Sequence, residues 1–391
     1  MSVRTLAILA AVGAVLLLLA VLGERSSAPP QRTSELLLPG LADVVNDLEE
    51  IKIVKAGNET VATLRPAENG WTVAERDGYP ADLGKLRQSL RALAEARIVE
   101  QKTSNPELYE RLGVDDVSNS ETRAVAVSFS GGGAELPTVI IGDVEGGELR
   151  YVRRAGEETS WLIDRNPDFP RNTEQWLDRT ILDVRGDRVQ QVTITHPDGE
   201  VVHIYKDERG QTNFTVADVP EGRELQYPGV ANVIGNALRE LNLEDVERAG
   251  ESDAMPIEVE WRTFDGLVVR ARGFERDDQS WMTFEASVDP EQAARFAPAE
   301  TDGDDETATD SGESASTDGD AGAAAATDGG EDASDAAAAD GQGTTETVDT
   351  SAVEAEAAEI NERVAGWRYR IASYQFDQMT RRMNDLLKAT E

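Results

Sequence analysis

Two histidines are the first residues to consider for catalysis or metal binding, because the chain contains no cysteine. His196 lies in THPDGE, where Pro-Asp-Gly predicts a hairpin turn at the protein surface. His203 follows seven residues later, across that hairpin, but no acidic third ligand accompanies the pair at the spacing of a metal site. Spacing alone does not exclude a Ser–His–Asp triad, although no G-x-S-x-G turn is present. The pattern predicts no catalytic residue and no bound metal.

Two kinds of glycine-containing segment resemble ligand-binding loops without completing the pattern. SGGGAELP, at residues 130–137, lacks the Lys-Ser/Thr of a phosphate loop and is predicted to be a flexible hairpin turn. TDGDDE and TDGGED resemble calcium loops, but neither reaches the twelve-residue pattern that ends in glutamate. We therefore expect no cofactor, and the chain is predicted not to be an enzyme.

The segment EQWLDRTIL contains the best candidates for a special role, which are Trp176, Leu177, Asp178 and Arg179. The apolar pair suits a buried face, whereas the charged pair is suited to contacts with a neighbouring unit. One interpretation is a structural junction between domains. The other is a partner-binding patch, since tryptophan and arginine are favoured anchors of protein interfaces.

Three segments that follow strand-like sequence have the pattern of an amphipathic helix. Each places apolar side chains at offsets of 0, 3, 7 and 10, which fall on one face of a helix. The three sets are Leu83, Leu86, Leu90 and Leu93; Ala231, Ile234, Leu238 and Leu241; and Phe376, Met379, Met383 and Leu386. Asp82 is predicted to cap the first helix. Preceding each segment are alternating strands with turn residues, and Trp71 is expected to point inward from one of them. The pattern predicts an α+β fold of repeated β-meander-plus-helix units with antiparallel sheets.

The N-terminus predicts a membrane anchor. Residues 5–23 are almost continuously apolar, and as a helix they would span about 28 Å, close to the hydrocarbon thickness of a bilayer. Cleavage after Val21-Leu22-Gly23 is the alternative. Arg4 precedes the span and the acidic bulk follows it, so the N-terminus is expected in the cytoplasm and the remainder outside it.

The negative charge is distributed unevenly along the chain and marks one segment as distinct. The net charge is −37, and residues 301–350 contain fifteen Asp or Glu with no Lys or Arg, a composition that repels nucleic acid. The tract from 298 to 350 has no aromatic residue, Leu or Ile, so it is predicted to be a disordered insertion. The predicted organisation is an anchor (1–23), a linker (24–40), a first unit with a β-rich extension (41–182), a second unit (183–250) and a third unit (251–391) that the tract interrupts.

Several of these features together resemble a bacterial family, the domain of unknown function 4340. They are the anchor, the opening strand LEEIKIV, W-x-V followed by YPAD and a helix, YVRR…WLID, and WLDR before a second unit. The matching residues are Trp71, Tyr79, Asp82, Trp176, Leu177, Asp178 and Arg179. The resemblance implies an uncharacterised auxiliary component of ABC-type transport systems linked to gliding motility.

These features favour a single-pass protein of the bacterial inner membrane with a periplasmic bulk. Its expected role is that of a non-catalytic accessory or scaffold subunit beside an ABC permease and ATPase. An envelope module that binds glycan or another polymer is the alternative, and a hydrolase of unknown specificity is third. Only 5% of the residues are aromatic, which disfavours a polymer-binding groove.

Overall fold

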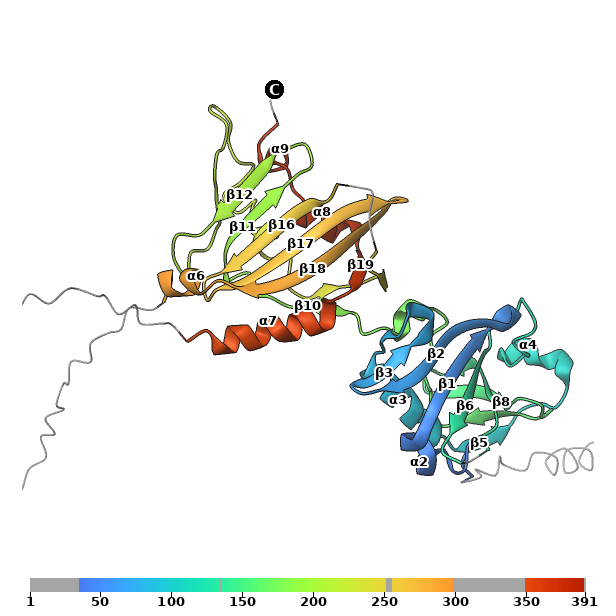
Figure 1. Cartoon of the computed structure of the whole chain (residues 1–391). Coiled ribbons are helices and arrows are strands. Elements are labelled where there is room, and N and C mark those ends of the chain that lie inside the picture. Colours follow the sequence, from blue (N-terminus) through green and yellow to red (C-terminus); the bar gives the residue numbers. More distant parts are fainter. Residues whose placement is uncertain (1–34, 134, 251–254, 298–348, 390–391) are drawn as a thin grey trace, which may run out of the picture.

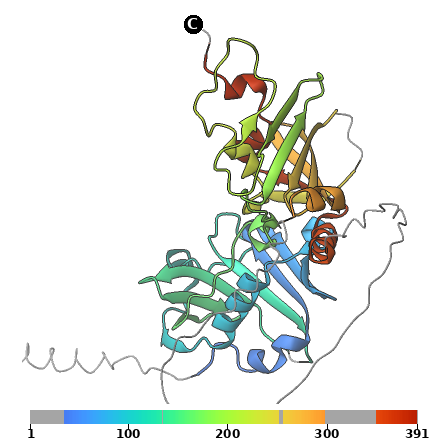
Figure 2. The same cartoon turned by 90° about the vertical axis from the view of Figure 1, so that its left-hand side faces the viewer.

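The computed structural model describes residues 35–133, 135–250, 255–297 and 349–389. Figures 1 and 2 show two bodies that meet at one end, each built on a large sheet. One sheet has nine strands and the other has eight, and all their strand pairs are antiparallel. The predicted α+β class with antiparallel sheets is therefore confirmed. The predicted anchor lies outside the described residues, among which no helix has the length and apolarity needed to cross a membrane.

The first body contains the nine-stranded sheet, in the order β4-β3-β2-β1-β6-β7-β8-β9-β5. Its strands are β1 (Leu48–Lys55), β2 (Glu59–Ala67), β3 (Gly70–Val73), β4 (Tyr79–Pro80), β5 (Ile98–Gln101), β6 (Val125–Gly131), β7 (Val139–Glu145), β8 (Leu149–Arg154) and β9 (Ser160–Ile163). Its helical elements are α2 (Leu41–Val44), η1 (Val45–Asp47), η2 (Ala56–Asn58), η3 (Ala74–Arg76), α3 (Leu83–Ala94), η4 (Pro106–Leu108), α4 (Tyr109–Leu112) and η5 (Thr173–Trp176).

The second body contains the eight-stranded sheet, in the order β13-β12-β11-β16-β17-β18-β19-β15. Its strands are β11 (Val189–Thr195), β12 (Val201–Tyr205), β13 (Thr215–Val216), β15 (Asp245–Arg248), β16 (Ile257–Thr263), β17 (Leu267–Arg276), β18 (Gln279–Val288) and β19 (Trp367–Ile371). Its helices are α5 (Asn232–Gly235), α6 (Pro290–Arg295), α7 (Ser351–Val364), α8 (Ser373–Met379) and α9 (Met383–Leu386). A separate pair, β10 (Thr180–Leu182) and β14 (Leu241–Asn242), precedes and follows α5.

The two bodies are two copies of one topology. In each, three strands form a meander, a helical segment follows, one strand crosses to the far edge, and four strands fill the middle. β1–β3 and β5–β9 thus correspond to β11–β13 and β15–β19. We call residues 36–178 the first repeat and residues 179–388 the second repeat.

The ends of the repeats correspond as well. In the first repeat Ala81 forms an isolated bridge with Leu177, closed by backbone hydrogen bonds of 2.8 and 3.0 Å. In the second repeat Leu225 forms the same bridge with Leu387, closed by bonds of 2.9 and 2.9 Å. The sequence predicts three units, whereas the structure joins the predicted second and third units through β11 and β16 in one sheet.

Helix α3 forms as the sequence predicts. The Asp82 carboxylate accepts a hydrogen bond from the backbone N–H of Lys85 at 2.9 Å and so caps the first turn. Leu86, Leu90 and Leu93 are buried against the sheet. The local cap and the single apolar face both favour a helix here, and the helix runs for twelve residues.

The second predicted helix is wrong beyond its first turn, because only α5 is α-helical and the chain then forms β14 and β15. The apolar side chains at its predicted positions are all buried. However, the amide of Asn232 turns back to accept a hydrogen bond from the backbone of Phe214 at 3.0 Å. Asparagine and glycine in this segment favour turns over a continued helix.

The third predicted helix is also interrupted, between α8 and α9. The Thr380 hydroxyl donates to the carbonyl of Phe376 at 2.8 Å, and Glu200 of the β11–β12 turn accepts from the backbone N–H of Met383 at 2.8 Å. Phe376, Met379 and Leu386 are nevertheless buried. The burial pattern is therefore confirmed, while the single helix is wrong because a distant glutamate ends it.

Two predicted boundaries lie close to the limits of the described residues. Leu37 and Leu38 fall in the predicted linker, yet both are buried, and Leu37 donates to the carbonyl of Ala96 at 2.8 Å. The first repeat therefore begins inside the predicted linker. Most of the predicted acidic insertion, residues 298–348, lies outside the described part of the chain, and α7 begins directly after it with four apolar residues buried at helical spacing.

Candidate functional site beside helix α3

An open groove of about 680 Å³ runs along α3 in the first repeat. Its walls come from α3, from the β2–β3 turn and from the α2–η1 segment, and its apolar lining includes Ala42, Val45, Trp71, Leu83, Leu86 and Leu90. Trp71 was predicted to point inward, but its ring is only half-buried because it forms part of this wall. Cavities of this size with apolar linings are typical of binding sites.

The second repeat has a corresponding cavity of a different character. It measures about 440 Å³ and is lined by Asp183, Arg185, Gly186, Asp187, Asn236, Arg239 and Glu240. Its charged side chains pair with one another, as Arg185 does with Asp187 and Arg239 does with Glu240 at 3.6 Å. A polar cavity whose charges are already paired offers little to an apolar ligand.

The difference between the cavities begins with one aromatic position. Trp71 and Phe214 occupy the same place in the meander, because each directly precedes the Thr-Val pair of its third strand. In the second repeat the Phe214 ring packs directly on Gly235, where a Cβ atom would overlap it. The Lys206 ammonium lies 4.4 Å from the centre of the same ring. Phe214 is therefore buried and fills its own repeat, whereas Trp71 leaves the groove open.

A smaller cavity of about 290 Å³ extends the groove toward the second repeat. Trp71 and Leu83 line both cavities, and the smaller one also has Asp82 and Asp178 in its wall. On its rim, Asn69 donates to Glu362 at the end of α7 at 3.3 Å. The groove thus ends in an acidic pocket at the junction of the repeats.

The four residues of the WLDR motif lie at this junction. Trp176 and Leu177 are fully buried, and the indole N–H of Trp176 donates to the carbonyl of Pro170 at 3.2 Å. Asp178 and Arg179 are exposed, and the Arg179 guanidinium donates to the carbonyl of Leu243 at 3.2 Å. The motif therefore divides into a buried half that closes the first repeat and an exposed half at the boundary between the repeats, where the Arg179 guanidinium hydrogen-bonds within the second repeat.

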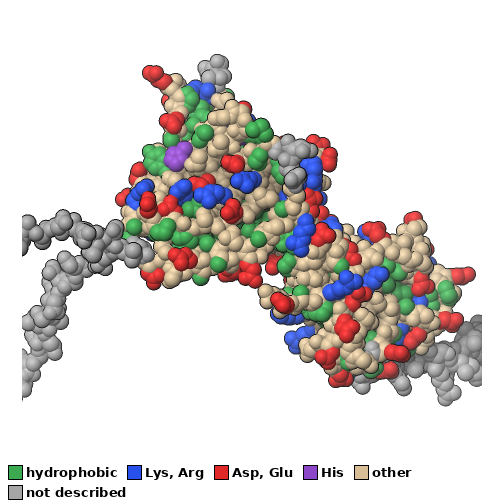
Figure 3. All heavy atoms as spheres, in the orientation of Figure 1, with side chains coloured by type: hydrophobic (Ala, Val, Ile, Leu, Met, Phe, Trp, Pro, Cys, Tyr) green, Lys and Arg blue, Asp and Glu red, His purple; other side chains and the backbone are tan. Residues whose placement is uncertain are grey.

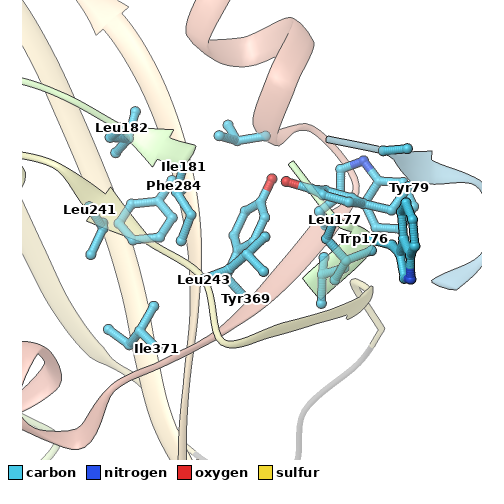
Figure 4. Close-up of a cluster of buried hydrophobic side chains, with 14 of the residues drawn as sticks. Tyr79, Trp176, Leu177, Ile181, Leu182, Leu241, Leu243, Phe284, Tyr369 and Ile371 are labelled. Carbon is cyan, nitrogen blue, oxygen red and sulfur yellow. The ribbon is translucent and has the colours of Figure 1, made fainter. Parts of the chain in front are cut away.

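Aromatic side chains from both repeats pack together at the junction (Figure 4). The Tyr79 ring lies edge-on to Trp367 at 5.0 Å and to Tyr369 at 6.2 Å. Tyr369 donates its hydroxyl to the carbonyl of Arg363 at 3.2 Å. Burial raises the pKa of both tyrosines above the ordinary value, so both hydroxyl groups stay protonated.

Charged contacts hold the same junction from outside. Arg76 of the first repeat pairs with Asp245 of the second at 2.6 Å and with Glu174 at 2.9 Å. Burial opposes the charge of Arg76, yet these partners raise its pKa above the ordinary value. Arg248 lies 3.7 Å from the centre of the Trp367 ring and donates to the carbonyl of Asp77 at 3.1 Å. The repeats are thus joined by apolar, ionic and hydrogen-bonding contacts.

The exposed face of the second sheet has a different pattern of charge. Arg270 pairs with Glu260 at 2.7 Å, and Arg272 pairs with Glu258 at 3.2 Å. Figure 3 shows acidic and basic side chains interspersed over the second repeat. Such paired charges are typical of a solvated sheet face, and they leave the α3 groove as the better binding candidate.

The two histidines have different surroundings in the structure. His196 lies in the predicted turn, but it is buried, because the C-terminal segment covers it and its Nε2 atom lies 3.5 Å from the carbonyl of Arg381. The prediction of a surface residue is therefore wrong. His203 contacts the Thr193 hydroxyl at 3.1 Å and stacks on Tyr205. Within the described part of the chain, no three His, Asp or Glu side chains are grouped as metal ligands.

Part of the chain matches a protein-family model. Residues 71–259 match the family model described as Domain of unknown function (DUF4340), which supports the assignment of the chain to that family. The matched region runs from β3 of the first repeat to β16 of the second and so includes α3 and the junction. No curated protein and no solved structure matches the chain.

Proposed function

We propose that the protein is a non-catalytic accessory subunit of an ABC-type transport complex and that the α3 groove binds another subunit of the complex. The observation that carries the proposal is the contrast between the repeats. One topology occurs twice, but at the same place in the meander Phe214 packs onto Gly235 in the second repeat, whereas Trp71 lines an open groove in the first that is larger and more apolar than the cavity of the second.

The position of the groove supports the proposal. The chain enters the first repeat at Leu36, which bridges to Arg97 just after α3, and residues Ala94 and Glu95 at this end of α3 line the groove. If residues 5–23 anchor the protein in the inner membrane, the tether of residues 24–35 reaches at most about 43 Å. The groove then lies within reach of a membrane-embedded permease on the periplasmic side.

The test is co-purification of the full-length chain, with its anchor intact, from detergent-solubilised membranes. We expect an ABC permease and ATPase to accompany the wild-type protein in stoichiometric amounts. Leu83→Glu should reduce their recovery by about tenfold, because it places a carboxylate in the apolar wall of the groove.

Arg239→Glu is the matched control, since Arg239 lines the corresponding cavity of the second repeat and is exposed. Its recovery of transport subunits should equal that of the wild type. Circular dichroism checks that both variants are folded. If folded Leu83→Glu retains its partners, or if no transport subunit accompanies the wild-type protein, the proposal is wrong.

A further inference from the structure

The occupant of the groove can be specified further, on the premise that the groove binds a partner protein as proposed above. We infer that it binds an amphipathic helix, aligned antiparallel to α3, whose C-terminal end carries lysine or arginine. The inference rests on the length of the groove, on the chemistry of its wall and on the distribution of charge along it.

The length favours a helix of about three turns. The groove is lined from Leu83 in the first turn of α3 to Ala94 at its end, a span of twelve residues and therefore about 18 Å. A compact small molecule would fill only part of this length. A helix would place three or four apolar side chains along it, at the spacing of one helical face.

The wall does not favour an added strand. The edge strand nearest the groove is β4, which has only two residues. Beyond it, Ala81 already pairs with Leu177, and Asp82 donates its backbone N–H to the carbonyl of Trp176 at 2.8 Å. Strand addition needs a row of free backbone groups, and this edge has been closed by the chain itself.

Charge sets the direction of the helix. The acidic extension with Asp82 and Asp178 lies at the N-terminal end of α3, so it attracts the positive end of a ligand. Basic side chains are best accommodated at the C-terminus of a helix, where they also offset the helix dipole. The bound helix therefore runs antiparallel to α3. Arg87, which makes no ion pair or hydrogen bond within the described residues, is placed on the rim for an acidic side chain of the same ligand.

Two synthetic peptides test the inference. Both are amphipathic helices of about 14 residues with leucines on one face, and they differ only in carrying two lysines or two glutamates at the C-terminal end. Binding is measured by fluorescence anisotropy to the full-length chain in lipid nanodiscs at low ionic strength. We expect the lysine peptide to bind at least about tenfold more tightly than the glutamate peptide.

The double variant Asp82→Asn/Asp178→Asn should abolish most of this preference. Asparagine keeps the side-chain oxygen that accepts from Lys85 at position 82 and from Thr180 at position 178, so only the charges are removed. Arg239→Glu, on the other cavity, should retain the full preference.

Equal binding of the two peptides, or binding of neither, overturns the inference. A preference that survives in the double variant also overturns it, since residues other than Asp82 and Asp178 would then recognise the charge of the peptide. The proposed function fails separately, when transport subunits do not accompany the wild-type chain or when Leu83→Glu retains them. Groove-dependent co-purification with equal peptide binding would thus reject only the ligand chemistry.

Discussion

Replacing Trp176 with alanine is expected to lower the free energy of unfolding by about 3–5 kcal/mol, the range for removing a large buried aromatic side chain. The ring is fully buried, lies 5.7 Å from the ring of Phe169 and donates a hydrogen bond to Pro170. Its backbone carbonyl also accepts from Asp82, the residue that caps α3. The substitution therefore loosens the core and the start of the groove helix together.

Urea denaturation of the purified chain measures this loss. Trp71→Ala is the matched control, because Trp71 is only half-buried in the groove wall and less of its surface is removed from water. We expect the control to lose at least about 1.5 kcal/mol less than Trp176→Ala. Equal losses would contradict the placement of Trp176 as the closing residue of the first repeat.

Replacing Tyr79 with alanine is expected to cost a similar amount, about 3–5 kcal/mol, and to uncouple the two repeats. Tyr79 belongs to the first repeat, is 1% exposed and packs its ring against Trp367 and Tyr369 of the second. Once these contacts are lost, each repeat retains its own sheet but little of the shared core. We therefore expect a single calorimetric transition in the wild type and two in the variant.

Tyr79→Phe is the control for this prediction. It keeps the ring packing and removes only the hydroxyl, while Tyr369 retains its bond to the Arg363 carbonyl. Its cost should be about 1 kcal/mol, with the single transition preserved. A single transition in Tyr79→Ala would show that the ionic contacts of Arg76 are sufficient to couple the repeats, against our expectation.

Features decided by neighbouring residues were predicted well from the sequence. The strands of the meanders follow from alternation, and α3 follows from its apolar face and the Asp82 cap, which is made within one turn. The third unit was predicted to continue on both sides of the acidic tract, and β18 and β19, which flank the tract, do pair, with Met282 opposite Tyr369. In each of these cases local pattern and tertiary structure agree.

Features decided by residues far apart in the sequence were not predicted. The chain after Phe214 forms only one helical turn, in which Gly235 lies under the Phe214 ring and the Asn232 side chain accepts from the Phe214 backbone. His196 is buried by a segment about 185 residues away. The groove depends on where two corresponding aromatic rings lie, because Phe214 packs directly on Gly235 in the second repeat whereas Trp71 lines the open groove of the first. The sequence did contain one signal of the duplicated topology. The dipeptide YP followed by an apolar helical pattern occurs at Tyr79 and again at Tyr227.

Site-specific photocrosslinking in living cells tests whether the groove of the first repeat is a docking site for a transport subunit. A photoreactive amino acid is placed at Ala67, an exposed position in the groove wall, and in a second strain at Arg239 in the corresponding cavity. We expect a crosslinked adduct that contains an ABC-transporter subunit from position 67 and none from position 239. Adducts of equal yield from both positions, or none from position 67 in a protein that is folded and in the membrane, would show that the groove is not the docking site.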